Sequence, residues 1–241
     1  MSKTLVVVVP DADTLAATVA SRLIAKIVDA QAERGIAGVV LTGGRIAKRV
    51  LAALPSLPEG KAIDWSRVDL WWGDERFLPA GDPERNETQA REALLDALPL
   101  DPARVHPMPA SDGPDGDDAE AAAARYAAEL RDGDATFDVL MLGVGEDGHV
   151  ASLFPGHPVL DETGSTTSAV HNSPKPPPTR ITLTMPTIQS ADEVWLIAAG
   201  PDKTDSVGRA VGGDKQLPAA HATGRTKTYW LLDQAAAAKT R

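Results

Sequence analysis

The stretch from residue 137 to residue 158 reads FDVLMLGVGEDGHVASLFPGHP. Its apolar run, Val139–Leu142, predicts a buried strand. The glycines that follow this strand are Gly143, Gly145 and Gly148. Glycines permit a tight backbone path around a small ligand, and on this path lie a carboxylate, Asp147, and an imidazole, His149. A carboxylate and an imidazole on a glycine-rich turn after a buried strand predict an active site.

Strands and helices are expected to alternate along the rest of the chain. Apolar or alternating runs predict strands at residues 4–9, 36–41, 68–72, 181–185, 193–199 and 227–232. Helical spacing, caps and alanine-rich composition predict helices at residues 15–34, 46–54, 86–98, 119–130, 186–191 and 204–211, and a helical tail after residue 232. This order predicts an α/β fold with a mostly parallel sheet. We expect a single domain over residues 1–241, because no repeat or linker divides the chain.

Three details of these elements carry structural expectations. The segment 11–14, Asp-Ala-Asp-Thr, supplies candidate N-terminal caps of the first helix, and Gly35 is its expected C-terminal cap. The segment 86–89, Asn-Glu-Thr-Gln, resembles a capping box that opens a helix. The strand at residues 4–9 is β-branched and does not alternate with polar residues, so we expect both of its faces to be covered.

The composition argues against several classes of protein. The 241 residues carry a formal net charge of −10, which disfavours binding to nucleic acid or to an anionic membrane surface. The chain has no cysteine, which excludes disulfides, a thiolate nucleophile and a cysteine-ligated metal, and fits a reducing compartment. No apolar run approaches the roughly 20 residues that span a bilayer. We therefore expect a cytoplasmic protein, and we take it to be a monomer.

A second group of candidate residues lies just after other predicted strands. Thr42, Gly43 and Gly44 form a turn between a strand and a helix, which presents backbone N–H groups and a helix dipole to an anion. Basic residues at strand ends or beside glycine turns are Arg45, Arg76, Arg180 and Lys203. Because the carboxyl ends of parallel strands form one edge of a sheet, these residues should converge there. In so acidic a chain, they predict a site for a compact anion such as phosphate.

Other chemistries fit the residues less well. Residues 143–148 match the dinucleotide pattern GxGxxG, but Pro155 prevents the long helix that must follow it. His149 and His157 do not have the spacing of metal ligands. Ser152 lacks the flanking glycines of a hydrolase nucleophile turn.

Two further pairs of residues are candidates for a catalytic role: Asp74 with Glu75, and Asp147 with His149. Asp74 and Glu75 point to opposite sides of a strand end, so they would not flank one glycosidic bond. We expect one of them to orient Arg76 or a substrate hydroxyl and the other to be solvated. Asp147 could fix the tautomer of His149 and raise its basicity, although a histidine at such a position often has no catalytic role.

Five segments, taken together, resemble the 6-phosphogluconolactonases of the oxidative pentose phosphate pathway. They are LTGG at 41–44, WGDERFLP at 72–79 with Asn86, GVGEDGHVASLFPG at 143–156, PKP at 174–176 with RITLT at 180–184, and GPDK at 200–203. They occur in the family's order and span most of the chain, and the third is long and specific. The resemblance implies hydrolysis of 6-phospho-D-glucono-1,5-lactone with no metal and no organic cofactor. It also implies a Rossmann-like sheet similar to that of glucosamine-6-phosphate deaminases and ribose-5-phosphate isomerases.

With this resemblance, roles can be assigned as hypotheses. His149 is the expected general base for the attacking water, and Asp147 is expected to orient it. Further residues expected to bind the substrate or its phosphate are Thr42, Gly43, Gly44, Arg45, Asp74, Arg76, Asn86, Gly145, Arg180 and Lys203. Which basic side chain touches phosphate and which faces the oxyanion stays open.

The chain departs from the family pattern at two places. The family often carries Ser-Gly-Gly-Ser-Thr-Pro at the first glycine turn, whereas Arg45 follows the glycines here, so its role stays open. The family often has Ser-Asn where this chain has Arg85 and Asn86, so only Asn86 carries over.

Two alternative functions are considered. A glucosamine-6-phosphate deaminase has a similar glycine turn, but it would carry a Met-Asp-Glu-Tyr-like strand end where this chain has residues 72–76, Trp-Gly-Asp-Glu-Arg. A non-catalytic sugar-phosphate sensor would carry a basic DNA-binding module, and we expect no room for one before the first strand.

Overall fold

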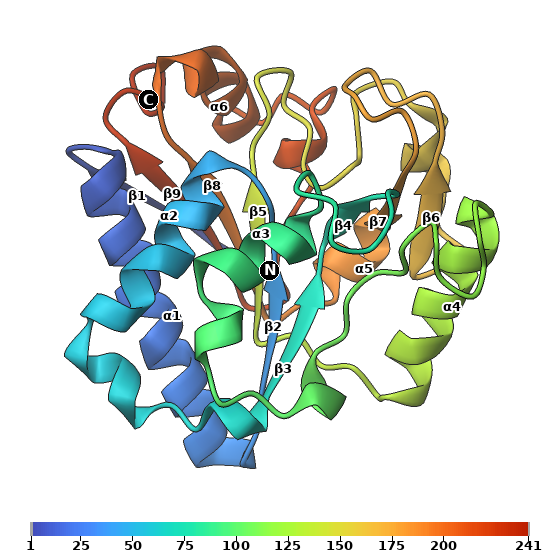
Figure 1. Cartoon of the computed structure of the whole chain (residues 1–241). Coiled ribbons are helices and arrows are strands. Elements are labelled where there is room, and N and C mark those ends of the chain that lie inside the picture. Colours follow the sequence, from blue (N-terminus) through green and yellow to red (C-terminus); the bar gives the residue numbers. More distant parts are fainter. Residues whose placement is uncertain (1, 241) are drawn as a thin grey trace.

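The computed structural model describes residues 2–240, which form two sheets (Figure 1). The larger sheet has six parallel strands in the order β1, β9, β8, β5, β2, β3. Their bounds are Lys3–Val9 (β1), Ala37–Leu41 (β2), Val68–Trp72 (β3), Val139–Gly143 (β5), Glu193–Ala198 (β8) and Lys227–Asp233 (β9). The predicted α/β fold with a mostly parallel sheet is confirmed.

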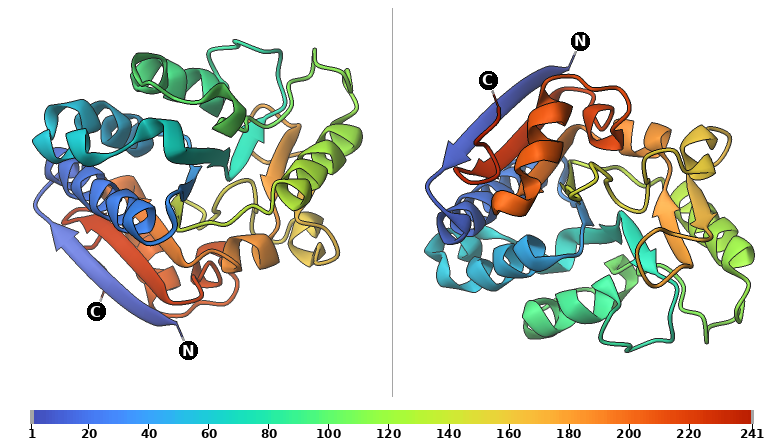
Figure 2. Two further views of the ribbon diagram at one scale, coloured as in Figure 1. Left: turned by 90° about the horizontal axis from the view of Figure 1, so that it is seen from below. Right: turned by 90° about the horizontal axis from the view of Figure 1, so that it is seen from above.

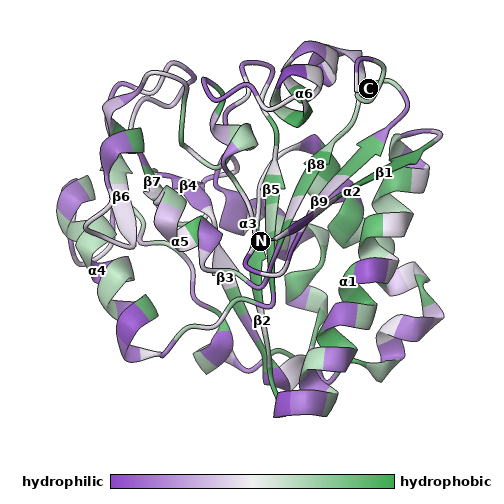
Figure 3. Cartoon of the chain, turned by 180° about the vertical axis from the view of Figure 1, so that it is seen from behind, coloured by the Kyte–Doolittle hydropathy of each residue, from purple (hydrophilic) through white to green (hydrophobic). Residues whose placement is uncertain are grey.

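Helices flank both faces of this sheet. The bounds of the α-helices are Ala12–Arg34 (α1), Arg45–Ala53 (α2), Asn86–Ala93 (α3), Ala119–Asp132 (α4), Met185–Gln189 (α5) and Thr204–Val211 (α6). The two views along the sheet show α1 and α2 on one face and α6 on the other (Figure 2). Every residue of β2 and β8 is buried, as parallel strands between two helical layers must be. Coloured by hydropathy, β5, β8 and β9 are mostly apolar (Figure 3).

Helix α1 has the caps that its sequence predicts. The Asp11 side chain accepts a hydrogen bond from the backbone N–H of Thr14 at 2.8 Å and so caps the first turn. Gly35 ends the helix in the left-handed conformation, with φ of 81°, and its N–H donates to the carbonyl of Gln31. Between these caps the buried residues repeat at helical spacing and face the sheet.

The smaller sheet is antiparallel, with the order β4, β7, β6. Its strands are Asp74–Arg76 (β4), Thr167–Val170 (β6) and Arg180–Leu183 (β7). Only β7 was expected: β4 has three residues, and the four residues of β6, Thr-Ser-Ala-Val, show no apolar run and no clear alternation. Strand β4 follows β3 after the single residue Gly73, so the chain passes directly from the large sheet to the small one.

Three expectations about individual elements are wrong. Strand β1 is an edge strand that pairs only with β9, so Val6 and Val8 remain 44% and 47% exposed instead of being covered. Helix α3 begins at Asn86 itself, so this residue is not the cap, and its side chain bonds to Asp74 instead. Up to residue 240, the alanine-rich tail after β9 forms turns and no helix, although the Asp233 carboxylate accepts a hydrogen bond from the N–H of Ala236 as a helix cap would.

Among residues 2–240, no helix combines the length and the apolar character needed to cross a membrane.

Candidate active site

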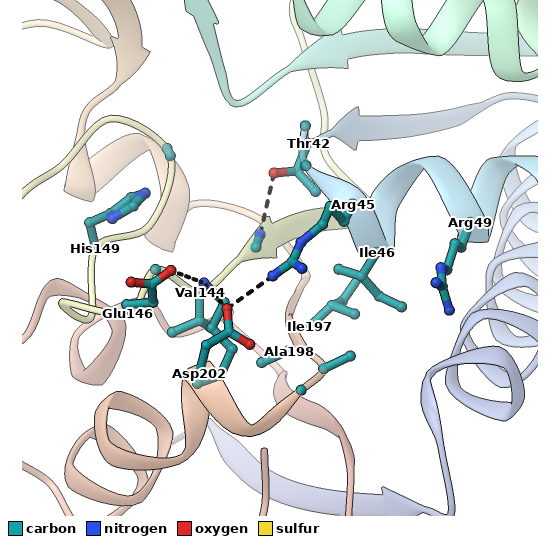
Figure 4. Close-up of a pocket in the computed structure, with 18 of the residues that line it drawn as sticks. Thr42, Arg45, Ile46, Arg49, Val144, Glu146, His149, Ile197, Ala198 and Asp202 are labelled. Atoms are coloured by element: carbon teal, nitrogen blue, oxygen red, sulfur yellow. Dashed lines mark hydrogen bonds and ion pairs between the residues drawn. The ribbon is translucent and has the colours of Figure 1, made fainter. Parts of the chain in front are cut away.

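The strand order places a crevice between β2 and β5. From β2 the chain continues to β3 on one side, and from β5 it continues to β8 and β9 on the other. In open parallel sheets, ligands bind outside the carboxyl ends of the strands at such a switch point. A pocket of about 490 Å³ opens there (Figure 4).

All but one of the residues predicted for the site line this pocket; the exception is Asp147, which does not line it and contacts it through His149. The walls of the pocket include His149 and every residue that was expected to bind the substrate or its phosphate: Thr42, Gly43, Gly44, Arg45, Asp74, Arg76, Asn86, Gly145, Arg180 and Lys203. Most of these residues follow strands of the large sheet or lie on the small sheet, and Asn86 opens α3; the parallel order of the large sheet brings most of them to one edge.

The turn after β2 forms one wall of the pocket through close backbone packing. A Cβ at Gly43 would overlap the side-chain amide of Asn86, so only glycine fits there. Gly44 has φ of 96° and lies at the N-cap of α2, where it offers no side chain to the helix. The Thr42 hydroxyl accepts a hydrogen bond from the N–H of Gly143 at 3.3 Å and ties the ends of β2 and β5 together (Figure 4).

The Asp147–His149 pair lies on the turn after β5. Nδ1 of His149 is 2.5 Å from Oδ1 of Asp147, which leaves Nε2 as the ring nitrogen available for chemistry. The ring also packs against Phe154, with 4.6 Å between ring centroids. Burial favours the neutral form of Asp147, but the hydrogen bond and charge of His149 outweigh it and hold the pKa of Asp147 below its usual range, with help from Lys175 at 3.9 Å.

Gly145 makes this pair possible. A Cβ at this position would lie 2.5 Å from Oδ1 of Asp147 and would overlap the imidazole of His149. The backbone N–H of Gly145 donates to the carbonyl of His149 at 2.9 Å and closes the turn. The glycine-rich sequence therefore serves to bring the two side chains close to the backbone and to each other.

Two basic side chains lie at the mouth of the pocket near β8. Nζ of Lys203 is 3.6 Å from Asp202 and 3.9 Å from Glu146, and its side chain is largely buried. Arg45 donates to Asp202 at 2.9 Å and is 83% exposed (Figure 4). These two cations lie beside two carboxylates, Asp202 and Glu146, so they offer N–H donors at this edge while their charges are largely balanced.

Arg76 and Arg180 reach the pocket from the small sheet. Arg76 donates to the side-chain carbonyl of Asn86 and, at 3.2 Å, to the backbone carbonyl of Glu84. Arg180 is buried, and its Nε and Nη2 donate to backbone carbonyls of the proline-rich loop at 174–178. Its Nη1 lies 3.9 Å from Asp74. Arg180 therefore uses much of its hydrogen-bonding capacity to stabilise the proline-rich loop that precedes it in the chain.

The expectation that Asp74 or Glu75 is solvated is wrong. Asp74 is 6% exposed and accepts a hydrogen bond from the Ser152 hydroxyl at 2.7 Å. Glu75 is fully buried, because α3 begins directly over its carboxylate. Burial raises the pKa of Glu75 to about 7, although nearby Arg85 and three backbone N–H donors favour the ionised form.

Two residues that shape the site, Ser152 and Asp233, were not predicted from the sequence. Ser152, set aside as a nucleophile, instead holds Asp74. Asp233 accepts hydrogen bonds from the N–H of Gly200 at 3.0 and 3.1 Å and shapes the turn before Lys203. Asp233 ends the strand β9, so the strand-end rule applied to the other candidates would have found it. Nothing in the local sequence pairs Ser152 with Asp74, which is 78 residues away.

A Rossmann-like sheet with an aspartate–histidine pair and several cations at its switch point defines a class of α/β enzymes that act on small anionic substrates. The chain belongs to the family described as glucosamine-6-phosphate isomerases/6-phosphogluconolactonase, whose profile matches residues 10–230.

Curated relatives and a solved structure agree with this assignment. A 6-phosphogluconolactonase of Streptomyces coelicolor is 61% identical over 95% of this chain and 92% of its own length. A 6-phosphogluconolactonase of Mycobacterium tuberculosis is 49% identical over 95% of this chain and 96% of its own length. The solved structure of 6-phosphogluconolactonase from Trypanosoma brucei is 28% identical, covers 100% of both chains and superposes with a TM-score of 0.83.

Proposed function

We propose that this protein hydrolyses 6-phospho-D-glucono-1,5-lactone to 6-phospho-D-gluconate, a reaction of the oxidative pentose phosphate pathway. The observation that carries the proposal is His149, which is hydrogen-bonded to Asp147 and lines a pocket together with Lys203 and Arg76. Relatives that are 49% and 61% identical over nearly their whole length are named for this activity.

His149 is assigned as the general base. Nε2 takes a proton from a water molecule while the water oxygen forms a bond to the lactone carbonyl carbon. The bond from that carbon to the ring oxygen then breaks, and the imidazolium returns the proton to the ring oxygen, which becomes a hydroxyl group. Asp147 holds Nδ1–H, keeps the ring in the required tautomer and stabilises the imidazolium.

The phosphate is assigned to Lys203, Arg76 and the backbone of residues 42–44. An ammonium, a guanidinium and the N-terminus of α2 are the groups that bind phosphate in proteins. The other lining residues expected to contact the substrate are Arg45, Asp74, Asn86, Gly145 and Arg180. The proposal includes no metal and no organic cofactor.

Replacement of the base tests the mechanism. We expect His149→Ala to lower kcat by about 10²- to 10⁴-fold, the usual contribution of a positioned general base. Freshly generated lactone is the substrate, and the uncatalysed hydrolysis is subtracted. Purified His149→Ala with a rate within a few-fold of the wild type would contradict the assignment.

A parallel assay separates the alternative functions. Release of ammonia from glucosamine-6-phosphate would support a deaminase, and tight binding of 6-phosphogluconate without any lactone turnover would support a sensor. We expect neither, because the Trp72–Arg76 strand end and the 143–156 segment match the lactonases.

The cellular context is part of the proposal. The absence of cysteine supports a reducing compartment such as the cytoplasm. The net charge of −10 argues against a nucleic-acid partner. We also propose that residues 1–241 form one domain and act as a monomer.

A further inference from the structure

The Glu75 carboxylate lies just behind the pocket wall and has no role in the mechanism above. It is fully buried on β4, between two residues of the pocket, Asp74 and Arg76. A buried carboxylate is costly unless hydrogen bonds and an opposite charge compensate it. The hydrogen-bond and ion-pair partners of Glu75 therefore indicate its role.

The carboxylate of Glu75 binds three backbone N–H groups. Its Oε1 accepts from Arg76 at 2.8 Å and from Asn86 at 2.7 Å, and its Oε2 accepts from Glu87 at 2.9 Å. The last two N–H groups belong to the first turn of α3, whose N-cap residue, Arg85, makes no capping bond with its side chain. Glu75 thus caps α3 from another element and complements its dipole.

Arg85 supplies the counter-charge. Its side chain is 1% exposed, and Nη2 lies 3.9 Å from Glu75. The same guanidinium donates to the backbone carbonyls of Arg76, Leu78, Met108 and Pro109. The cation therefore fixes the loop that follows β4 as well as the carboxylate.

These contacts set the mutual position of two pocket side chains. Glu75 holds the backbone N–H of both Arg76 and Asn86, and Nη1 of Arg76 then donates to the side-chain carbonyl of Asn86. The Asn86 amide in turn donates to the backbone carbonyl of Asp74 at 2.8 Å. Arg76 and Asn86 are ten residues apart, and their side chains meet at one wall of the pocket.

We propose that Glu75, neutralised by Arg85, is a positioning residue that aligns the Arg76–Asn86 pair with the phosphate of the substrate. This inference rests on the proposed function, because it takes the ligand of Arg76 to be the phosphate. Glu75 does not touch the substrate. It acts by holding the backbones from which the two binding side chains project.

The Glu75→Gln variant tests this role. The glutamine amide has the same size as the glutamate side chain. Its NH₂ group, however, replaces a carboxylate oxygen that accepts a backbone N–H, so one hydrogen bond is lost and two donors face each other. We expect KM for the phosphorylated lactone to rise by about 10- to 100-fold, the cost of misplacing one hydrogen bond to a charged group. We expect kcat to change by no more than a few-fold, because phosphate binding is shared by the ground state and the transition state. Assays are run above pH 7, because the pKa of Glu75 is about 7.

The split between KM and kcat distinguishes positioning from a general loss of structure. A smaller folded fraction lowers apparent kcat and leaves KM unchanged. The inhibition constant of the product, 6-phosphogluconate, should rise in parallel with KM. If Glu75→Gln does not fold, Glu75→Asp is used, since it keeps the charge for Arg85 but withdraws the oxygens from the N–H groups. The same rise in KM is expected.

Glu87→Gln is the matched control. Glu87 lies on the same helix, and its carboxylate is 3.3 Å from Nη2 of Arg85, but it binds none of the three N–H groups. We expect its KM to stay within a few-fold of the wild type. An unchanged KM in Glu75→Gln, or an equal rise in Glu87→Gln, would overturn the role of Glu75. A wild-type protein without lactonase activity would instead overturn the proposed function.

Discussion

At the scale of single residues, the site depends on contacts too close for a larger side chain. Gly145 leaves space for the hydrogen bond between Asp147 and His149, and Gly43 leaves space for the Asn86 amide. Gly145 does not have a positive φ, so its conformation alone would accept another residue. Glycine is required at position 145 because the side chains of Asp147 and His149 leave no space for a Cβ.

The Gly145→Ala variant measures this steric requirement. The added Cβ would lie 2.5 Å from Oδ1 of Asp147, so the pair must separate. We expect kcat to fall by about 10²-fold or more, towards the effect of removing the base. Steady-state kinetics and a thermal melt of each protein are the measurements. Gly60→Ala is the control, because its Cβ would meet nothing closer than 3.5 Å and should leave kcat unchanged.

At the scale of elements, the ends of the helices decide where the pocket can form. The start of α2 lines the pocket, and the start of α3 carries Asn86. The two helices are capped differently from α1. Helix α1 has its own aspartate, whereas α3 depends on Glu75 from a strand of the other sheet.

The Asp11→Ala variant tests the cap of α1. Loss of the bond to the Thr14 N–H should lower the free energy of unfolding by about 0.5–2 kcal/mol, measured by urea denaturation. Asp29→Ala is the comparison, because Asp29 is exposed on the same helix, far from its N-terminus, and should change stability by no more than about 0.5 kcal/mol. Equal losses in both variants would show that the cap contributes nothing specific.

At the scale of the whole molecule, an imidazole joins parts of the chain that are far apart in sequence. His106 stacks on Trp71, with ring centroids 3.8 Å apart, and bonds to Glu129 of α4 at 2.7 Å. Its other nitrogen is 3.7 Å from Asp69 of β3. Burial disfavours the charged ring, but the hydrogen bonds and charges of Asp69 and Glu129 outweigh burial and raise the pKa of His106 to about 9.

The His106→Gln variant tests this link through the pH dependence of stability. A pKa raised from 6.5 to about 9 means that the folded state binds the proton more tightly than the unfolded state. The stabilisation is complete below pH 6.5 and is lost as the pH rises through 9. The wild type should therefore lose more free energy of unfolding than His106→Gln between these limits, as followed by urea denaturation at each pH. Parallel curves for the two proteins would contradict the prediction.

The strands of the large sheet, the residues at its carboxyl edge and the glycine turn with Asp147 and His149 were predictable from the order of amino acids alone. These features are encoded locally, in continuous apolar runs and in the residues directly after them. The ends of α1 were also predictable, because Asp11 and Gly35 act on their own helix.

The small sheet, the exposed face of β1 and the burial of both Asp74 and Glu75 follow from packing between distant segments and were not predictable. Three side-chain contacts were not predictable either. Ser152 donates to Asp74, Arg85 neutralises Glu75, and Arg180 donates hydrogen bonds to the proline-rich loop. Each of these outcomes depends on a partner from another element. The solvation of a charge and the covering of a strand edge are set by what packs against them, and no local pattern contains that information.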